Sequence, residues 1–177
     1  MKYKALLFGS IGTLIESSDI QRTSFNEAFK EAGLDWYWDE QDYRNLLKKS
    51  GGTKRVEDFA EKNNVNVNAS QIRNRKTEIF SSYIIKNKQK LRKSVYEIIN
   101  FSKKNNIKLS LSTSTTINNV EAIFESLSDQ ITREDFDFIG NKSLVKYEKP
   151  NPEIYKVTLE HLNIEASDCI AIEDTEE

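Results

Sequence analysis

"KALLFGSIGTL", residues 4–14, is the stretch of sequence that decides the fold. Its apolar run Ala5–Phe8 has the length and composition of a buried strand, and a turn at Gly12–Leu14 follows it. Three further runs of the same kind are separated from one another by segments of helical periodicity. The four predicted strands are Tyr3–Phe8, Lys108–Ser112, Phe136–Ile139 and Cys169–Ile172. Strands that alternate with helices favour an α/β fold with a parallel sheet.

Helical patterns flank the last three of these strands. Val95–Lys104 precedes the second strand and Asn118–Leu127 follows it. A third helix is predicted to run to about Leu162, with Asn151 as its N-cap and Pro152 at its first helical position.

The interval between the first and second strands has only helical patterns. The helices predicted there are Ser24–Ala32, Glu40–Lys49, Lys54–Lys62 and Ser70–Lys88. We therefore predict two domains: an α/β core of residues 1–16 and 91–177, and an all-helical cap of residues 17–90. The hinges are placed at Glu16–Ser18 and Asn87–Leu91. Because ligands bind at the carboxyl ends of parallel strands, a cap inserted there is expected to cover the site.

Composition excludes several classes of function. The 177 residues include 26 basic and 28 acidic side chains, so no single sign of charge points to nucleic acid or a membrane surface. The start MKYKALLF is too short for a secretory signal, and no apolar run is long enough for a membrane span. A single cysteine, Cys169, cannot form an internal disulfide. We expect a soluble, cytoplasmic protein.

Four segments at the ends of the predicted strands line up in order: Phe8–Leu14, Leu111–Thr115, Glu148–Pro152 and Ile172–Thr175. Their order and spacing resemble the haloacid dehalogenase (HAD) superfamily of phosphatases and phosphomutases. In that family the first motif is Asp-x-Asp-Gly-Thr, the second a Ser or Thr, the third a Lys and the fourth a pair of acids. The resemblance implies a Rossmann-like core with an inserted helical cap.

A narrower resemblance comes from the predicted cap. The CbbY-type sugar-bisphosphate phosphatases, which are close to β-phosphoglucomutase, are similar at Ser24–Phe29, Glu31–Trp38 and Ser50–Gly52, and Asn119–Ala122 after the second motif also fits. Where that subgroup has an acid and a His soon after the first motif, this chain has Ser18 and Gln21. The resemblance assigns the retained Arg22, and Arg55 after the glycine turn, to the sugar phosphate.

The resemblance also implies roles for the core residues. In the family, the first Asp attacks phosphorus, the second transfers protons, and Mg²⁺ offsets the charge of the transferred group. Thr113 and Lys149 match the phosphate-binding positions, and Glu173 and Asp174 match the metal-binding acids. Without the resemblance, Thr113 reads as a helix-capping hydroxyl, Lys149 as a solvated loop lysine and the acids as a capping pair for a helix.

The first motif departs from the family pattern. Gly9 stands at the position of the nucleophile and Ile11 at that of the acid/base, so no catalytic residue of this motif is intact. Ser10 is expected to point to the other side of the strand, by continued alternation. The metal pair Glu173 and Asp174 is then vestigial, and Mg²⁺ binding is doubtful. A phosphate is expected to bind without metal, at Lys149 and the backbone N–H groups of Gly9–Gly12.

The end of the chain departs as well. It stops at Glu177, soon after the fourth motif, whereas family members continue with a helix and a strand. A fragment and a decayed gene both explain this, and a partner could complete the sheet edge. Three functions stay open: a catalytically impaired phosphatase homologue, a regulatory protein that binds a phosphorylated sugar, and an active Mg²⁺-dependent phosphatase with a substitute nucleophile.

Overall fold

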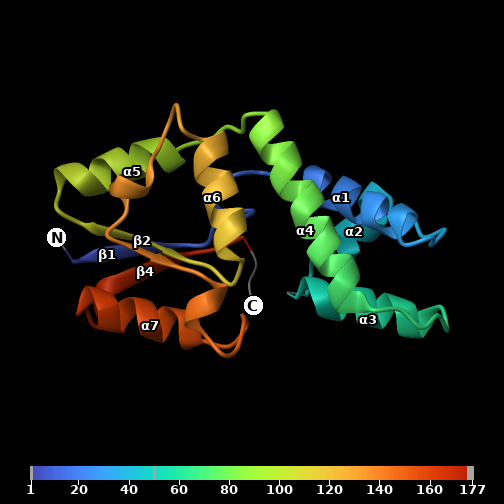
Figure 1. The fold of residues 1–177 in the computed structure, drawn as a ribbon. Coiled ribbons are helices and arrows are strands. Elements are labelled where there is room, and N and C mark those ends of the chain that lie inside the picture. Colours follow the sequence, from blue (N-terminus) through green and yellow to red (C-terminus); the bar gives the residue numbers. More distant parts are fainter. Residues whose placement is uncertain (1, 50, 175–177) are drawn as a thin grey trace. The chain divides into compact units, whose positions relative to one another are not determined.

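The computed structural model describes residues 2–49 and 51–174 and alternates strands with helices (Figure 1). The strands are β1 (Ala5–Phe8), β2 (Lys108–Ser112), β3 (Phe138–Gly140) and β4 (Cys169–Ile172). The helices are α1 (Ser18–Glu31), α2 (Glu40–Leu46), α3 (Gly52–Lys62), α4 (Ala69–Lys86), α5 (Val95–Lys104), α6 (Ile117–Ser126) and α7 (Glu153–Leu162). Residues of the predicted motifs at Ser50 and Thr175, and the chain end, lie outside the described residues.

The four strands form one parallel sheet in the order β3-β2-β1-β4. Leu6 of β1 is in register with Leu109 of β2 on one side and with Ile170 of β4 on the other. Figure 1 shows α5 and α6 on one face of the sheet and α7 on the opposite face. This confirms the α/β fold with a parallel sheet. All strands are parallel, so the segments after β1, β2 and β4 emerge at the same edge.

Two strands differ from their predicted bounds. The first begins at Ala5 instead of Tyr3, and the third begins at Phe138 instead of Phe136. A 3₁₀ turn at Arg133–Asp135 lies just before the third strand and ends with Phe136 as its C-cap. The Phe136 ring then packs edge-on against Phe124 of α6, with 5.7 Å between ring centroids. Phe136 therefore lies in the segment before β3 and contacts α6.

Contacts divide the chain into two compact units. One, the core unit, contains residues 1–16 and 85–176; the other, the helical unit, contains residues 17–84. The predicted second hinge, Asn87–Leu91, lies in the core unit. There the Gln89 N–H donates to the Ser126 carbonyl (3.1 Å) and the Leu91 N–H to the Gln130 side chain (3.0 Å). These bonds tie the segment to α6 and to the loop after it.

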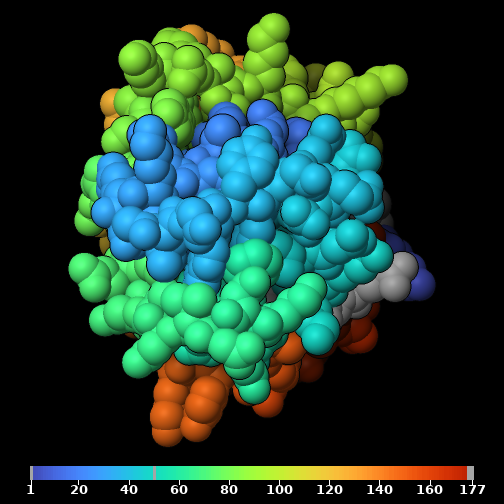
Figure 2. Space-filling model, turned by 90° about the vertical axis from the view of Figure 1, so that its right-hand side faces the viewer, coloured from blue at the N-terminus to red at the C-terminus, as the bar shows by residue number. Residues whose placement is uncertain are grey.

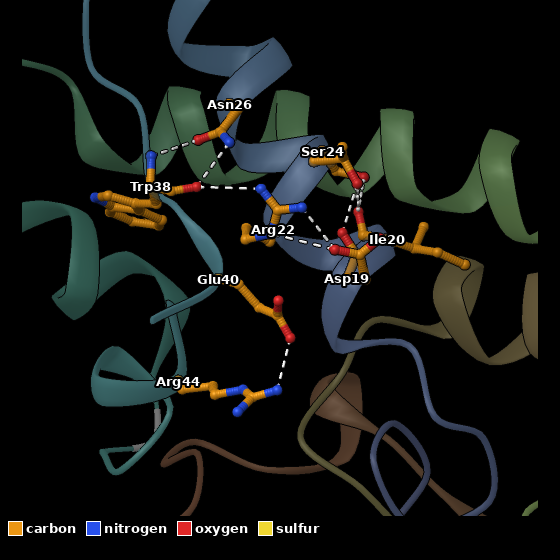
Figure 3. A network of polar contacts seen from close by, with 9 residues as sticks. Asp19, Ile20, Arg22, Ser24, Asn26, Trp38, Glu40 and Arg44 are labelled. Carbon is orange, nitrogen blue, oxygen red and sulfur yellow. Dashed lines mark hydrogen bonds and ion pairs between the residues drawn. The ribbon is translucent and has the colours of Figure 1, made fainter. Parts of the chain in front are cut away.

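The helical unit has an aromatic core. Phe25 and Phe29 of α1 pack around the buried Trp38, with 4.9 and 4.7 Å between ring centroids. The Asn26 side chain both accepts from the Trp38 N–H and donates to the Trp38 carbonyl, each at 2.9 Å (Figure 3). This pair of bonds anchors the segment between α1 and α2. Figure 2 shows the surface of this unit, coloured from blue to green.

Helix α1 begins at Ser18, earlier than the predicted Ser24. Its first turns are polar and carry no apolar stripe, so periodicity does not find them. None of the described helices is long and apolar enough to span a bilayer.

Candidate phosphate site

The turn after β1 lies at the carboxyl edge of the sheet. The Gly9 N–H donates to the Ile172 carbonyl of β4 (2.9 Å), and the Gly12 N–H donates to the Ile15 carbonyl (2.9 Å). Gly12 has φ +85°, a backbone conformation that residues with a side chain rarely adopt. The Arg92 guanidinium donates a hydrogen bond to the Gly12 carbonyl at 2.8 Å and so stabilises the turn.

These bonds bear on one expectation about phosphate binding. The N–H groups of Gly9 and Gly12 already donate to carbonyls within the fold. Phosphate binding by the backbone of this turn stays a prediction, and it would fall to the N–H groups of Ser10 and Ile11.

Glycine at position 9 leaves a space that other side chains fill. A β-carbon built there would overlap with the Glu173 carboxylate and would lie 2.7 Å from Thr13 Oγ1. Thr13 is 6% exposed, and its hydroxyl is among the buried polar atoms without a hydrogen-bond partner. Ile11, half-buried nearby, bridges to Ile15 and carries no titratable group.

Ser10 does not point away from the site as predicted. Its hydroxyl donates to Thr113 Oγ1 at 2.8 Å, and both residues are buried. Alternation fails here because β1 ends at Phe8, so Ser10 already belongs to the turn. Thr113 Oγ1 also accepts from the Thr115 N–H (3.2 Å). Thr113 thus caps its turn, and its own hydroxyl proton is available to a ligand oxygen.

Lys149 is held between the second motif and the fourth. Its N–H donates to Ser114 Oγ at 2.9 Å, and its ammonium forms an ion pair with Glu173. The Tyr155 hydroxyl of α7 donates to the same carboxylate oxygen, and the Lys149 ammonium lies 4.8 Å from the centre of the Tyr155 ring. Burial, together with the bond to Glu173, raises the pKa of Tyr155. The phenol therefore stays protonated and keeps donating.

Local sequence explains where this network stands. The N-cap of α7 is Pro152 and not Asn151 as predicted, and the helix begins at Glu153. The Asn151 side chain still accepts from the Glu153 N–H at 3.0 Å, which holds the short segment between Lys149 and α7. Tyr155 follows on the first turn.

Asp174 lies against the glycine of the first turn. A β-carbon at Gly12 would overlap with its carboxylate. Desolvation, followed by the neighbouring negative charge of Glu173, raises the pKa of the Asp174 carboxyl. Both carboxylates of the fourth motif are thus packed onto the turn of the first.

The described residues of this site offer few free oxygen ligands for a Mg²⁺ ion. Mg²⁺ prefers octahedral oxygen coordination and binds proteins through carboxylates. Within residues 2–49 and 51–174, no three His, Cys, Asp or Glu side chains converge in a way that could hold a metal. Glu173 is already paired with Lys149, and Gly9 offers no carboxylate.

Arg22 is engaged within the helical unit. It donates to the Asp19 carboxylate (2.6 Å) and to the Trp38 carbonyl (3.3 Å), as Figure 3 shows. The hydrogen bond that the guanidinium donates to Asp19 raises its pKa. Its role toward a sugar phosphate stays a prediction.

Arg55 is engaged in the same way. Its guanidinium donates to the carbonyls of Leu46 (3.0 Å) and Lys49 (2.9 Å), and it lies 5.6 Å from the centre of the Tyr43 ring. Burial lowers its pKa. These contacts stabilise the C-terminal end of α2, where carbonyl groups lack helical partners.

Arg55→Met is therefore expected to lower the free energy of unfolding of the helical unit by about 2–3 kcal/mol, because charged hydrogen bonds are lost and carbonyls are left unpaired. Both tryptophans, Trp36 and Trp38, lie in this unit, so their fluorescence during urea unfolding reports on it alone. Unchanged stability with weaker binding of a sugar bisphosphate would instead assign Arg55 to the ligand.

Sequence reasoning missed three side chains of this site. Tyr155 lies one turn into α7, Ser10 was expected to point elsewhere, and Thr13 was read only as part of a turn. The only available signal was position: Tyr155 follows the Lys-Pro-Asn-Pro segment closely, and Thr13 follows Gly12.

Comparison with known proteins identifies the class. The family model of haloacid dehalogenase-like hydrolases matches residues 3–177. The chain belongs to this hydrolase family, and its membership suggests a family dependence on Mg²⁺.

Within the family, the chain is similar to CbbY proteins. It is 33% identical to Protein CbbY of Cereibacter sphaeroides over 175 residues, covering 97% of this chain and 76% of that protein. It is 32% identical to Protein CbbY of Rhodobacter capsulatus, covering 99% and 78%. A crystal structure of a CbbY mutant from Rhodobacter sphaeroides, in complex with xylulose-1,5-bisphosphate, superposes with a TM-score of 0.83 at 32% identity, covering 96% of this chain and 76% of that one. β-Phosphoglucomutase from Clostridium difficile shares the fold, with a TM-score of 0.76 at 20% identity.

Proposed function

We propose that this chain is a CbbY-type phosphatase homologue that binds a phosphorylated sugar but is catalytically impaired. The main observation behind this proposal is that the phosphate-binding side chains are present while the catalytic aspartates of the first motif are absent. Thr113 and Lys149 lie beside the turn of that motif, while Gly9 and Ile11 offer no group that attacks phosphorus or moves a proton.

The side chains present have the chemistry of a phosphate site. An ammonium group and hydroxyl donors form charge-assisted hydrogen bonds to phosphate oxygens. Gly9 and Ile11 stand where the family has two aspartates, so two carboxylates are missing from the site. The lower negative charge favours binding of a dianion without a compensating metal. Binding is therefore proposed to be independent of Mg²⁺.

The proposed ligand class comes from the relatives. One CbbY structure contains xylulose-1,5-bisphosphate and another contains phosphate. By analogy with them we propose a sugar phosphate or bisphosphate as the ligand of this chain.

Lys149→Met is expected to weaken the binding of xylulose-1,5-bisphosphate by about tenfold or more, because a charged hydrogen bond to a phosphate is worth roughly 1.5–3 kcal/mol. Isothermal titration calorimetry with and without Mg²⁺ measures this. Lys156→Met is the matched control, since Lys156 is exposed on α7. Binding that requires Mg²⁺, or equal loss in both variants, would contradict the proposal.

A further inference from the structure

Glu173 occupies the place that the missing side chain at position 9 would take. Its carboxylate is the nearest group to a β-carbon built on Gly9, and its carboxyl carbon would lie 3.0 Å away. The same carboxylate pairs with the Lys149 ammonium and accepts a hydrogen bond from the Tyr155 hydroxyl. One side chain thus fills the vacated space and neutralises the phosphate-binding cation.

The arrangement uses little exposed surface. The side chains of Lys149 and Glu173 are 21% and 23% exposed, so the pair is screened by solvent less than a surface ion pair. A carboxylate in contact with an ammonium and a phenol makes the same kinds of contact that a phosphate oxygen would make. The two anions cannot use the Lys149 ammonium equally at the same time without bringing their negative charges together.

We infer that Glu173 is an internal anion that competes with phosphate for Lys149. Phosphate binds when the Glu173 carboxylate swings away from the ammonium, and the pair re-forms when phosphate leaves. This inference rests on the proposed phosphate binding, but its geometric part, occupancy of the Gly9 space by Glu173, does not.

The first test measures competition. Glu173→Gln removes the charge and keeps the shape, so the Kd for inorganic phosphate is expected to fall about tenfold or more, whereas Glu160→Gln, an exposed control on α7, leaves it unchanged. An unchanged or higher Kd in Glu173→Gln, with wild-type binding that still depends on Lys149, overturns the competition and leaves the proposed function standing.

The second test needs no ligand. Gly9→Ala places a methyl group where the Glu173 carboxylate lies, so its Tm is expected to fall by about 4 °C or more in far-UV circular dichroism. In a Glu173→Ala background the same change is expected to cost clearly less, because the nearest of the clashing atoms is gone and the Thr13 hydroxyl is the next. Equal losses in the two backgrounds overturn the geometric part of the inference, the occupancy of the Gly9 space by Glu173. If the cycle shows coupling but no variant binds phosphate, the proposed function fails and the competition fails with it.

Discussion

Wild-type protein is expected to hydrolyse xylulose-1,5-bisphosphate at the background rate, even with Mg²⁺ present. Gly9 has no carboxylate to attack phosphorus, and Ile11 can neither donate nor accept a proton. Loss of a nucleophile with its proton carrier typically costs about 10⁶-fold in kcat. Release of inorganic phosphate measures the rate. Turnover that follows the purified protein and disappears in Lys149→Ala would contradict this expectation.

Restoring the first motif should require one further change. The double variant Gly9→Asp with Ile11→Asp is expected to stay nearly silent, because the Glu173 carboxylate occupies the space of the new Asp side chain and holds Lys149. Adding Glu173→Asp shortens that side chain by one methylene and relieves the overlap. The triple variant is expected to exceed the wild-type rate by about 10³-fold or more.

The comparison between these variants separates two explanations. If the double variant is already active without the change at Glu173, the Glu173 side chain moves aside and does not block the new Asp. A silent triple variant that is folded by circular dichroism would show that the site has lost more than its first motif. Glu160→Asp in the double background is the control for an acid shortened elsewhere on the core unit.

The sequence predicted the layout of the sheet because its strands are short apolar runs between periodic helices. Lys108–Ser112 and Cys169–Ile172 have the predicted bounds. The start of α1 was missed because Ser18–Gln21 carries no apolar periodicity, and Phe136 was misassigned because a β-favouring residue also suits a contact between a helix and the sheet.

The candidate site was predicted by type but not by contact. The positions of Gly9, Thr113, Lys149 and Glu173 after the predicted strands placed them at the carboxyl edge of the sheet, where ligands of parallel α/β folds bind. The pairing of Lys149 with Glu173 could not be predicted, because it joins two residues 24 positions apart whose side-chain contact the local sequence does not define. The turn of Ser10 toward Thr113 depends on where β1 ends, a boundary that local sequence defines poorly.

Lys76 is the most unexpected feature of the helical unit. The helix pattern gave no reason to bury it, yet it is 6% exposed on α4. Its ammonium donates to Gln21 Oε1 at 2.8 Å and lies 5.0 and 4.8 Å from the ring centres of Phe25 and Phe80. Among the described residues no carboxylate forms an ion pair with it. Burial, together with the positive charges of Arg73 and Arg55, lowers the pKa of Lys76 to about 7.

This pKa sets the direction of a pH dependence. The ordinary pKa of 10.5 applies to the unfolded chain, so between about pH 7 and 10.5 the unfolded state binds more protons at Lys76 than the folded state does. Stability of the helical unit therefore rises with pH across this window. Below about pH 7 both states are protonated and the full penalty remains. Above 10.5 both are neutral and the penalty is absent.

Lys76→Met is accordingly expected to stabilise the helical unit at pH 7, by on the order of 4 kcal/mol before the lost bond to Gln21 is subtracted, because each pKa unit corresponds to about 1.4 kcal/mol. Methionine has a similar length and suits the contact with Phe25 and Phe80. Tryptophan fluorescence during urea unfolding measures the gain at pH 7, and the gain should shrink steadily toward pH 10. Lys62→Met, the same change at an exposed position of α3, should alter stability little at either pH. A destabilised Lys76→Met variant, or a gain that does not depend on pH, would show that the buried ammonium is compensated by groups other than Gln21.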